Sequence, residues 1–273
     1  MLYEFVPFHP VAATCVLHEG QRTRNRKMML ITRSDYQRER FNFLSSIVDL
    51  KSAVGLEIGA SDLPTVGRDQ GLCFHANSRT KEEMSALWSV PVADTPEIDY
   101  LIDRLGPISG SITDRIFDYL IAAHVLEHIP DPISFLQDLC KLLREGGMIL
   151  LAIPDKRHTF DAPREVTPIE HILNDHHQKA RYPSIEHIMQ CAPCVIPDLK
   201  RLGPAELYAW AKQNYESGEA DVHCHVWTDA DFFDQVDEIM KAGLLPGVSV
   251  ACKEYNKPGF NEFRIALRVE KRS

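Results

Sequence analysis

One segment limits the fold more than any other: a strand, a helix and a second strand follow one another over residues 116–153. The strands are IFDYLIAA (116–123) and MILLAI (148–153), and both are largely apolar. Between them, Asp131 can cap a helix with Pro132 in its first turn, and Gly146–Gly147 are expected to end it. Strands that are apolar on both faces lie inside a sheet, and a helical crossover makes them parallel. The segment therefore predicts an α/β fold, with a Rossmann-like, mainly parallel sheet and helices on both faces.

The chain before this unit continues the same alternation. A helix is expected to begin at Ser34, which can act as its cap. Strands are expected over AVGLEIG (53–59) and GLCFHA (71–76), and a further helix over TKEEMSALW (80–88). Before Ser34 the pattern is hard to interpret, and the basic run at residues 22–27 is expected to be solvated or to contact a partner.

The chain after this unit is first irregular and then returns to α/β. Residues 161–222 are rich in His, Pro and Cys and contain helical stretches, which predicts an inserted helical cap. Thr228 and Asp231 have capping-box spacing for the next helix, and KPGF joins two final strands, expected to be antiparallel. We therefore expect an N-terminal arm (1–33) and one domain (34–273) that carries the insertion.

Composition excludes several classes of protein. The 273 residues suit one large domain with an elaboration, and no apolar run approaches the roughly 18 to 20 residues of a membrane span. A net charge of -9 without a Lys/Arg block argues against a nucleic-acid partner. Seven cysteines, an odd number, fit reduced thiols, and the opening lacks a secretory signal, so we expect a cytoplasmic protein. A homo-oligomer is compatible with the sequence.

The turn after the first strand, Glu57-Ile58-Gly59-Ala60-Ser61, is the first candidate binding site. Ligands of open α/β sheets bind at the carboxyl ends of the strands, and Gly59 has no Cβ to block a ligand. A dinucleotide site prefers three glycines and a helix that faces the pyrophosphate. A single glycine preceded by an acid better suits a ligand with a cationic amino group, such as S-adenosylmethionine.

Two further positions extend this candidate site. Asn77 follows the second strand, where such folds hydrogen-bond ribose hydroxyls, and it offers fewer acceptor contacts than an acid. Asp99 is expected to contact an adenine amino group. A surface turn and a helix cap are the alternatives for these two residues.

Several motifs occur together in a known order. The run HVLEH…DP…L…GG…L.IPDKR.TFD, together with LEIGAS, EIDYLID and HCHVWTDADF, resembles class I S-adenosylmethionine-dependent methyltransferases, and bacterial members acting on sugars or other small molecules most of all. The resemblance covers residues 34–160 well and the last 50 residues loosely. It implies that cofactor contacts come from Glu57, Gly59, Ala60, Ser61, Asn77, Asp99, Tyr100, Ala123 and His124. The family usually has an acid where this chain has Asn77.

Methyl transfer to a hydroxyl needs alignment and a base, and histidine is the natural base near neutral pH. We take His124, Arg157, His223 and His225 as catalytic candidates. Arg157 can clamp an acidic acceptor, or can pair internally with Asp155 or Asp161. Glu127 and His128 are expected to orient their loop.

A metal is not predicted, but four residues of the sequence leave a zinc site open as an alternative. Cys191, Cys194, His223 and His225 offer two thiolates and two imidazoles for a tetrahedral zinc ion. On a strand, residues two apart face the same side, so the two imidazoles would converge. The other histidines of the insertion are expected on helices, at solvated or packed positions: His171, His176, His177 and His187.

The sequence thus predicts an enzyme that moves the methyl group of S-adenosylmethionine to an oxygen of a sugar or another small biosynthetic intermediate. A methyltransferase fold that has lost catalysis and acts as a binding or scaffold protein is one alternative. An NADPH-dependent reductase with Arg79 at a 2′-phosphate is another, although the single glycine and the absence of a convincing Tyr/Lys pair oppose it.

Overall fold

The computed structural model describes residues 31–88 and 91–270, so the basic run of the predicted arm lies outside the described residues. Seven strands form one sheet in the order β3-β2-β1-β4-β5-β7-β6. The strands are β1 (Val54–Ile58), β2 (Leu72–Asn77), β3 (Tyr100–Leu101), β4 (Phe117–Ala123), β5 (Leu143–Pro154), β6 (Val248–Glu254) and β7 (Glu262–Val269). The helices are α1 (Arg33–Ser45), α2 (Lys81–Trp88), α3 (Ile108–Ser111), α4 (Pro132–Leu139), α5 (Ile169–Gln178), α6 (Ile185–Val195), α7 (Pro204–Ser217) and α8 (Asp229–Lys241).

The sheet has the predicted class. Strands β1 to β5 pair in parallel, whereas β7 runs antiparallel to both β5 and β6. The switch in strand order lies between β1 and β4, which is where open α/β sheets form their binding crevice. The predictions of a mainly parallel sheet and a C-terminal antiparallel pair are confirmed.

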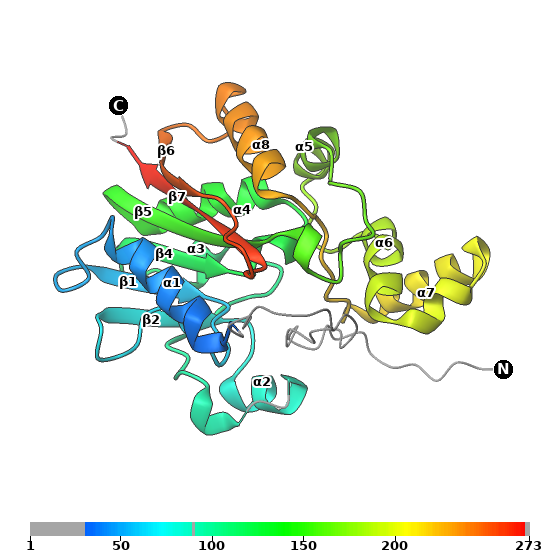
Figure 1. Ribbon diagram of the computed structural model, residues 1–273, viewed down its shortest axis with the longest axis horizontal. Helices are drawn as coiled ribbons and strands as arrows, with labels where there is room; N and C mark the ends of the chain where they lie inside the picture. The colour runs from blue at the N-terminus through cyan, green and yellow to red at the C-terminus, as the bar shows by residue number, and fades with distance from the viewer. Residues whose placement is uncertain (1–30, 89–90, 271–273) are drawn as a thin grey trace, which may run out of the picture.

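Helices lie on both sides of the sheet (Figure 1), and alternate residues of β4 belong to two different core clusters. Leu120 and Ala122 lie in the larger core cluster with residues of α4 and α8. Tyr119 and Ile121 lie in a second cluster with residues of α1. All four are fully buried, which explains why the strand is apolar on both faces.

Helix ends show where the sequence was informative and where it was not. Asp131 caps α4 as predicted, since its Oδ1 accepts from Ser134 N at 2.9 Å. The prediction that Gly146–Gly147 end this helix was wrong: a 3₁₀ turn over Cys140–Leu142 follows α4, and β5 begins at Leu143, which pairs with Phe117. Likewise, Thr32 rather than Ser34 is the cap of α1.

The capping at α1 has a physical reason. The Thr32 backbone N–H donates to Asp35 Oδ2 at 2.7 Å, which satisfies a group that the helix itself leaves free. At α8 the prediction was correct, because Thr228 is the cap and Asp231 N donates to its hydroxyl at 3.4 Å.

Residues 161–222, predicted as a helical insertion, lie beyond the carboxyl ends of the parallel strands (Figure 1). Helices α6 and α7 share a small core of their own with Ala220, Val222 and Cys224. The insertion also reaches back over the sheet, because Arg104, in the loop after β3, donates to the Ala220 carbonyl at 2.6 Å. The residues after α7 therefore lie close to the ends of the strands.

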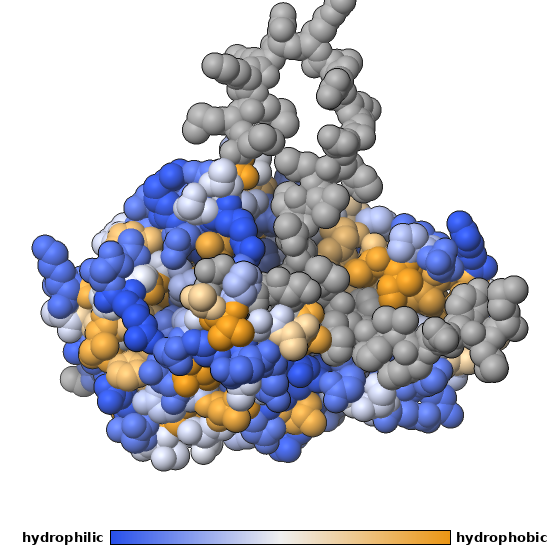
Figure 2. Space-filling model, turned by 90° about the horizontal axis from the view of Figure 1, so that it is seen from below, coloured by the Kyte–Doolittle hydropathy of each residue, from blue (hydrophilic) through white to orange (hydrophobic). Residues whose placement is uncertain are grey.

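Most of the face shown in Figure 2 is hydrophilic, with small hydrophobic areas between the polar side chains. Within residues 31–88 and 91–270, no helix combines the length and the apolar character needed to cross a bilayer.

Candidate functional site

Gly59 forms the turn at the carboxyl end of β1. Its φ of +75° lies in the left-handed region, and its N–H donates to the Ala76 carbonyl at 2.9 Å. A Cβ at this position would lie 2.7 Å from Val125 Cγ2. Both backbone conformation and space therefore require glycine here.

Glu57 holds this turn from inside the protein. Its carboxylate accepts from Thr65 N at 2.7 Å and from Thr65 Oγ1 at 2.8 Å. Burial raises the pKa of Glu57 to about 7, although the hydrogen bonds from Thr65 oppose the shift. The acid expected at the cofactor's amino group thus has protein partners, and Thr65 was not recognised from the sequence.

Asn77 and its neighbours at the end of β2 are also turned toward the protein. Its Nδ2 lies 3.4 Å from the Ala60 carbonyl and 3.0 Å from Met84 Sδ, and its Oδ1 accepts from Arg79 N. Ser61 Oγ donates to Asp62 Oδ1 at 3.0 Å. The structure thus brings Asn77 next to the Gly59 turn, as the predicted site requires.

Asp99 and Tyr100, predicted near the adenine, lie at the start of β3, beside the carboxyl end of β2. β3 pairs with Ala76 and Asn77 in parallel, so Tyr100 begins the strand and Ile102 follows its carboxyl end. Asp99 Oδ2 accepts from His75 N at 2.8 Å, and Tyr100 OH donates to Asp114 Oδ2 at 3.4 Å. The sequence did not show β3, and without that strand its carboxyl end could not be located.

His124 directly follows Ala123 at the carboxyl end of β4. Its φ is 53°, which is rare for a residue other than glycine and is often found at functional sites. Its Nε2 lies 2.9 Å from Glu262 Oε2, and Glu262 also accepts from Arg40 Nε at 3.0 Å. Burial opposes ionisation of Glu262, but Arg40 and His124 outweigh it and lower the pKa. A buried carboxylate therefore fixes one side of the His124 ring.

The other side of His124 faces Glu127, in the 3₁₀ turn after β4. Glu127 is fully buried, and neither carboxylate oxygen has a hydrogen-bond partner among the residues that the structure describes. Glu127 Oε1 lies 3.8 Å from His124 Nδ1 and 3.9 Å from His128 Nε2. Glu127, His128 and His223 place one ligand atom each within 4.8 Å of one another, and we name these three the Glu127 group.

Each imidazole of the Glu127 group has its own carboxylate. His223 Nδ1 lies 2.6 Å from Asp161 Oδ2, and His128 Nδ1 lies 2.8 Å from Asp221 Oδ1. The two rings meet edge to face, with centroids 4.7 Å apart. Burial alone would lower the pKa of His128, but Asp221 and Glu127 raise it to about 9, while the pKa of Asp221 falls to about 2 despite burial because His128 is close. His128 is therefore a cation at neutral pH.

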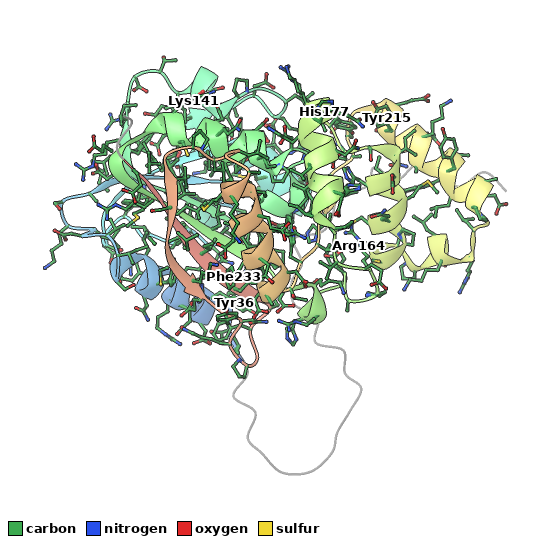
Figure 3. The ribbon with its side chains drawn as sticks, turned by 90° about the horizontal axis from the view of Figure 1, so that it is seen from above. Tyr36, Lys141, Arg164, His177, Tyr215 and Phe233 are labelled. Carbon is green, nitrogen blue, oxygen red and sulfur yellow. The ribbon has the colours of Figure 1, made fainter. Side chains whose placement is uncertain are left out.

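Arg164 fixes the position of His223. It lies between the sheet and the insertion helices (Figure 3), where its Nη1 donates to Asp161 Oδ1 at 2.8 Å and to the His223 carbonyl at 2.9 Å. The Cys224 backbone N–H donates to the Glu127 carbonyl at 2.7 Å. Segments 97 positions apart, at Glu127 and Cys224, are thus joined at the end of β4.

Arg157 has the internal pairing that the sequence left as an alternative. Its Nε donates to Asp155 Oδ1 at 2.8 Å, and its Nη2 donates to Asp229 Oδ1 at 2.8 Å. Asp161, the other expected partner, pairs with Arg164 instead. As arranged, the guanidinium holds the end of β5 against the start of α8.

The four residues that the sequence left open as a zinc site do not come together. In the described parts of the chain, no group of three or more possible metal ligands contains Cys191 or Cys194. Residues 221–226 do not form a strand, so side chains two positions apart need not face the same side. His225 accordingly does not join His223 in the Glu127 group. It lies fully buried with His171, Asp175 and His187, and burial followed by the nearby His187 lowers the pKa of His225 to about 3.

Residues 33–193, more than half of the chain, match the family model described as a methyltransferase domain. The chain belongs to the methyltransferase domain family. The predicted membership of the S-adenosylmethionine-dependent methyltransferases is thereby confirmed.

The curated relatives of this methyltransferase domain are distant. The ubiquinone biosynthesis O-methyltransferase of Xanthomonas oryzae pv. oryzae is 23% identical over 123 residues, which are 41% of this chain and 48% of that protein. The chain thus spans about half the length of the curated relatives that it matches.

Solved structures also resemble it at low identity. Magnesium protoporphyrin IX methyltransferase from Synechocystis PCC 6803 with bound S-adenosylhomocysteine has a TM-score of 0.42 and 11% identity, covering 85% of this chain and 83% of that one. The plantazolicin methyltransferase in complex with S-adenosylhomocysteine has a TM-score of 0.46 and 11% identity, covering 88% and 85%.

Proposed function

We propose that this methyltransferase domain transfers the methyl group of S-adenosylmethionine to a hydroxyl oxygen of a small molecule, with His223 as the base. The observation that carries the proposal is the buried Glu127 carboxylate without described hydrogen-bond partners, placed between His124, His128 and His223 at the end of β4. An acceptor hydroxyl would supply the hydrogen bond that Glu127 lacks.

The residues at this edge of the sheet fit the cofactor. Gly59 leaves the chain turn free of a side chain, and acidic groups surround the end of β4, which suits a ligand that carries a cationic sulfur and a cationic amino group. When bound, S-adenosylmethionine supplies a methyl carbon activated by the adjacent positive sulfur. Contact with the cofactor stays a proposal for every residue predicted to make it: Glu57, Gly59, Ala60, Ser61, Asn77, Asp99, Tyr100, Ala123 and His124.

His223 suits the role of base better than its neighbour. A base must be neutral before the reaction, and the pKa of His128, raised to about 9, makes that ring cationic. Asp161, 2.6 Å from His223 Nδ1, orients the other ring nitrogen of His223 in the way that a carboxylate orients histidine in hydrolase triads. The hydroxyl proton passes to that nitrogen as the oxygen–methyl bond forms and the sulfur–methyl bond breaks.

His128 and Glu127 keep the charge of the site balanced. The protonated His128 lies between Asp221 and Glu127, so it reduces the cost of a buried carboxylate that has no other partner. We infer that Glu127 accepts from the acceptor's hydroxyl and thereby directs its oxygen toward the methyl carbon.

The acceptor class is inferred from the curated relatives and from the Asp161–His223 pair. The curated relatives are O-methyltransferases, and an Asp–His pair serves deprotonation of a hydroxyl. We propose an oxygen of a sugar or another small biosynthetic intermediate, and a cytoplasmic location.

Isothermal titration calorimetry with S-adenosylhomocysteine tests the cofactor. We expect a Kd in the micromolar range, and no heat at millimolar ligand would contradict the proposal in favour of a scaffold protein. The acceptor is then sought by incubation with S-adenosylmethionine and a panel of monosaccharides, catechols and hydroxy acids, with release of S-adenosylhomocysteine as the readout. NADPH fluorescence serves as the control for the reductase alternative.

A further inference from the structure

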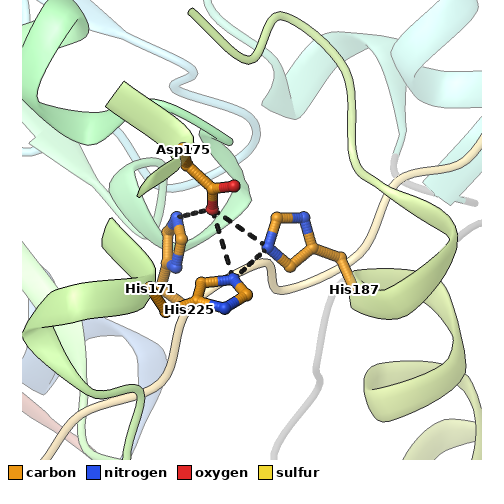
Figure 4. Close-up of side chains that lie close together, drawn as sticks. All are labelled: His171, Asp175, His187 and His225. Carbon is orange, nitrogen blue, oxygen red and sulfur yellow. Dashed lines mark hydrogen bonds and ion pairs between the residues drawn. The ribbon is translucent and has the colours of Figure 1, made fainter. Parts of the chain in front are cut away.

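A second histidine cluster lies where α5, α6 and the segment before α8 meet (Figure 4). It shares no residue with the Glu127 group. His171 and Asp175 are four residues apart on α5, so they share one face of that helix. His187 comes from the first turn of α6, and His225 comes from the segment that leads to α8. We name these four the Asp175 group.

The side chains of the Asp175 group converge on one small volume. Asp175 Oδ2 lies 3.2 Å from His171 Nε2, 3.3 Å from His187 Nε2 and 3.9 Å from His225 Nε2. His171 Nε2 and His187 Nε2 are 2.7 Å apart. For comparison, ligand atoms around a tetrahedral zinc ion lie about 3.3 Å apart, given bond lengths of roughly 2.0 to 2.2 Å.

This convergence is buried and its hydrogen bonding is incomplete. The side chains of His187 and His225 are 1% and 0% exposed, and that of Asp175 is 9% exposed. Asp175 Oδ2 and His225 Nδ1 have no hydrogen-bond partner within the described part of the chain. Buried polar atoms without partners are costly, and three imidazoles here face a single carboxylate.

We propose that the Asp175 group is a binding site for a divalent first-row transition metal, zinc in the first place, with His171, Asp175, His187 and His225 as its ligands. Imidazole and carboxylate are ligand types that zinc accepts, and four protein ligands make a closed, structural site. The ion would tie α5, α6 and the segment before α8 together.

Without a metal, the same atoms can share a proton. Ser184 N–H donates to His187 Nδ1 at 3.1 Å, which leaves the proton of a neutral His187 ring on Nε2, directed at His171. His225 Nε2 lies 3.1 Å from the Pro130 carbonyl, to which it can donate. A metal ion bound at Nε2 of His187 and Nε2 of His225 would take the place of the protons on these two atoms. The hydrogen bonds with Ser184 and Pro130 are therefore the contacts that would change. The experiment must therefore distinguish an ion from a shared proton.

The site also has a consequence for the proposed reaction. The backbone nitrogen of His225 lies 3.3 Å from the Glu127 carbonyl oxygen, and the backbone N–H of the adjacent Cys224 donates to the same oxygen. An ion held by His225 would fix the segment that carries His223. The proposal itself does not depend on methyl transfer and is tested without it.

Metal content is the first measurement, made by mass spectrometry on untagged protein after dialysis against a weak chelator and readdition of zinc. We expect one zinc per chain, a lower Tm after removal by a strong chelator, and recovery of the Tm on readdition, because the ion binds the folded state. A folded chain that retains no zinc would overturn the proposal.

Variants locate the ion. Asp175→Asn and His187→Gln should each lower the zinc content about tenfold or more at matched protein concentration, since each removes one of four ligands. His177→Gln, an exposed position on the same helix, is the matched control and should retain zinc (Figure 3). Unchanged zinc content in Asp175→Asn would overturn the assignment.

Cobalt(II) substitution keeps the test valid if a ligand variant fails to fold. In the wild-type chain we expect the visible absorption of tetrahedral Co(II) with nitrogen and oxygen ligands. A thiolate-to-cobalt charge-transfer band would overturn the proposal, because it would place the ion at cysteines such as Cys191 and Cys194.

Discussion

The Glu127 group and the Asp175 group contain the same kinds of side chain but combine them differently. In the Glu127 group, His223 and His128 each have a carboxylate of their own, and Glu127 remains available. In the Asp175 group, three imidazoles compete for one carboxylate. The first arrangement orients each ring separately, whereas the second brings four ligand atoms to one point.

One short segment contributes a histidine to each group, His223 to the Glu127 group and His225 to the Asp175 group. His223 and His225 are two positions apart, yet the rings of His128 and His223 have centroids 4.7 Å apart, and those of His187 and His225 are 5.3 Å apart. Because residues 221–226 are irregular, their side chains can enter different environments. We infer that the number of carboxylates per imidazole, and not the presence of histidine, distinguishes the proposed base from the proposed metal site.

The largest expected effect comes from replacing His223, the proposed base of the Glu127 group. His223→Gln should lower the rate of methyl transfer by about 10² to 10⁴, which is the usual contribution of a positioned base. It should leave the affinity for S-adenosylhomocysteine and the zinc content unchanged. The rate is measured as S-adenosylhomocysteine released with the acceptor found for the wild-type chain.

His225→Gln is the matched variant, and it should show the reverse order of effects, with zinc content falling first. If His223→Gln lost zinc and retained its rate, the roles assigned to the two groups would be exchanged.

The next largest effect concerns cofactor binding at the Gly59 turn, which lies outside both groups. Gly59→Val should weaken binding of S-adenosylhomocysteine by about a hundredfold or more, because valine strains a φ of +75° and its Cβ would lie 2.7 Å from Val125 Cγ2. Calorimetry measures the loss. Gly203→Val, where φ is negative and a Cβ would meet only Glu206 at 3.6 Å, is the control. Equal affinity in the wild type and Gly59→Val would remove the cofactor from this turn.

A smaller effect concerns pH and the ion pair of the Glu127 group. The folded pKa of His128 is raised from 6.5 to about 9, so this pair stabilises the fold fully below pH 6.5 and progressively less as the pH rises through 9. The pKa of Asp221 is lowered from 3.8 to about 2, so the same stabilisation is present above pH 3.8 and is lost as the pH falls through 2.

Asp221→Asn should therefore lower the Tm most between about pH 4 and 6.5 and least near pH 10. Thermal unfolding of both chains across this range measures the difference. A Tm difference that stays constant up to pH 10 would show that the His128–Asp221 pair does not carry the effect.

The fold was predictable because its signals are local. The apolar strands β4 and β5, the Asp131 cap and the Thr228 cap each follow from a few adjacent residues, and together they specify a parallel sheet. β3 was missed because two residues, Tyr100 and Leu101, are too short for any period to appear. The end of α4 was misjudged because the pairing of Leu143 with Phe117 is a tertiary contact.

The site was less predictable because it depends on partners distant in the sequence. The Gly59 turn and His124 follow from the strand ends, but the Asp161–His223 pair joins residues 62 positions apart. The histidines of α5 and α6 were expected at solvated or packed positions, and His187 is indeed buried. Its contact with His171 could not be predicted, because no local pattern gives the relative position of the two helices. The spacing of His171 and Asp175 on one helix face was the available signal.

The smallest expected effect concerns Arg157, which the sequence offered as a clamp for an acidic acceptor. Its fork is bound to Asp155 and Asp229, and its side chain is 48% exposed, so it has little left to offer a ligand. Arg157→Lys should change the rate of methyl transfer by no more than about threefold and the stability by about 1 kcal/mol or less, as exposed ion pairs usually do. The rate assay and thermal unfolding measure both. A hundredfold loss of rate with unchanged Tm would instead place Arg157 at the acceptor, and the Glu127 group would then be only part of the catalytic site.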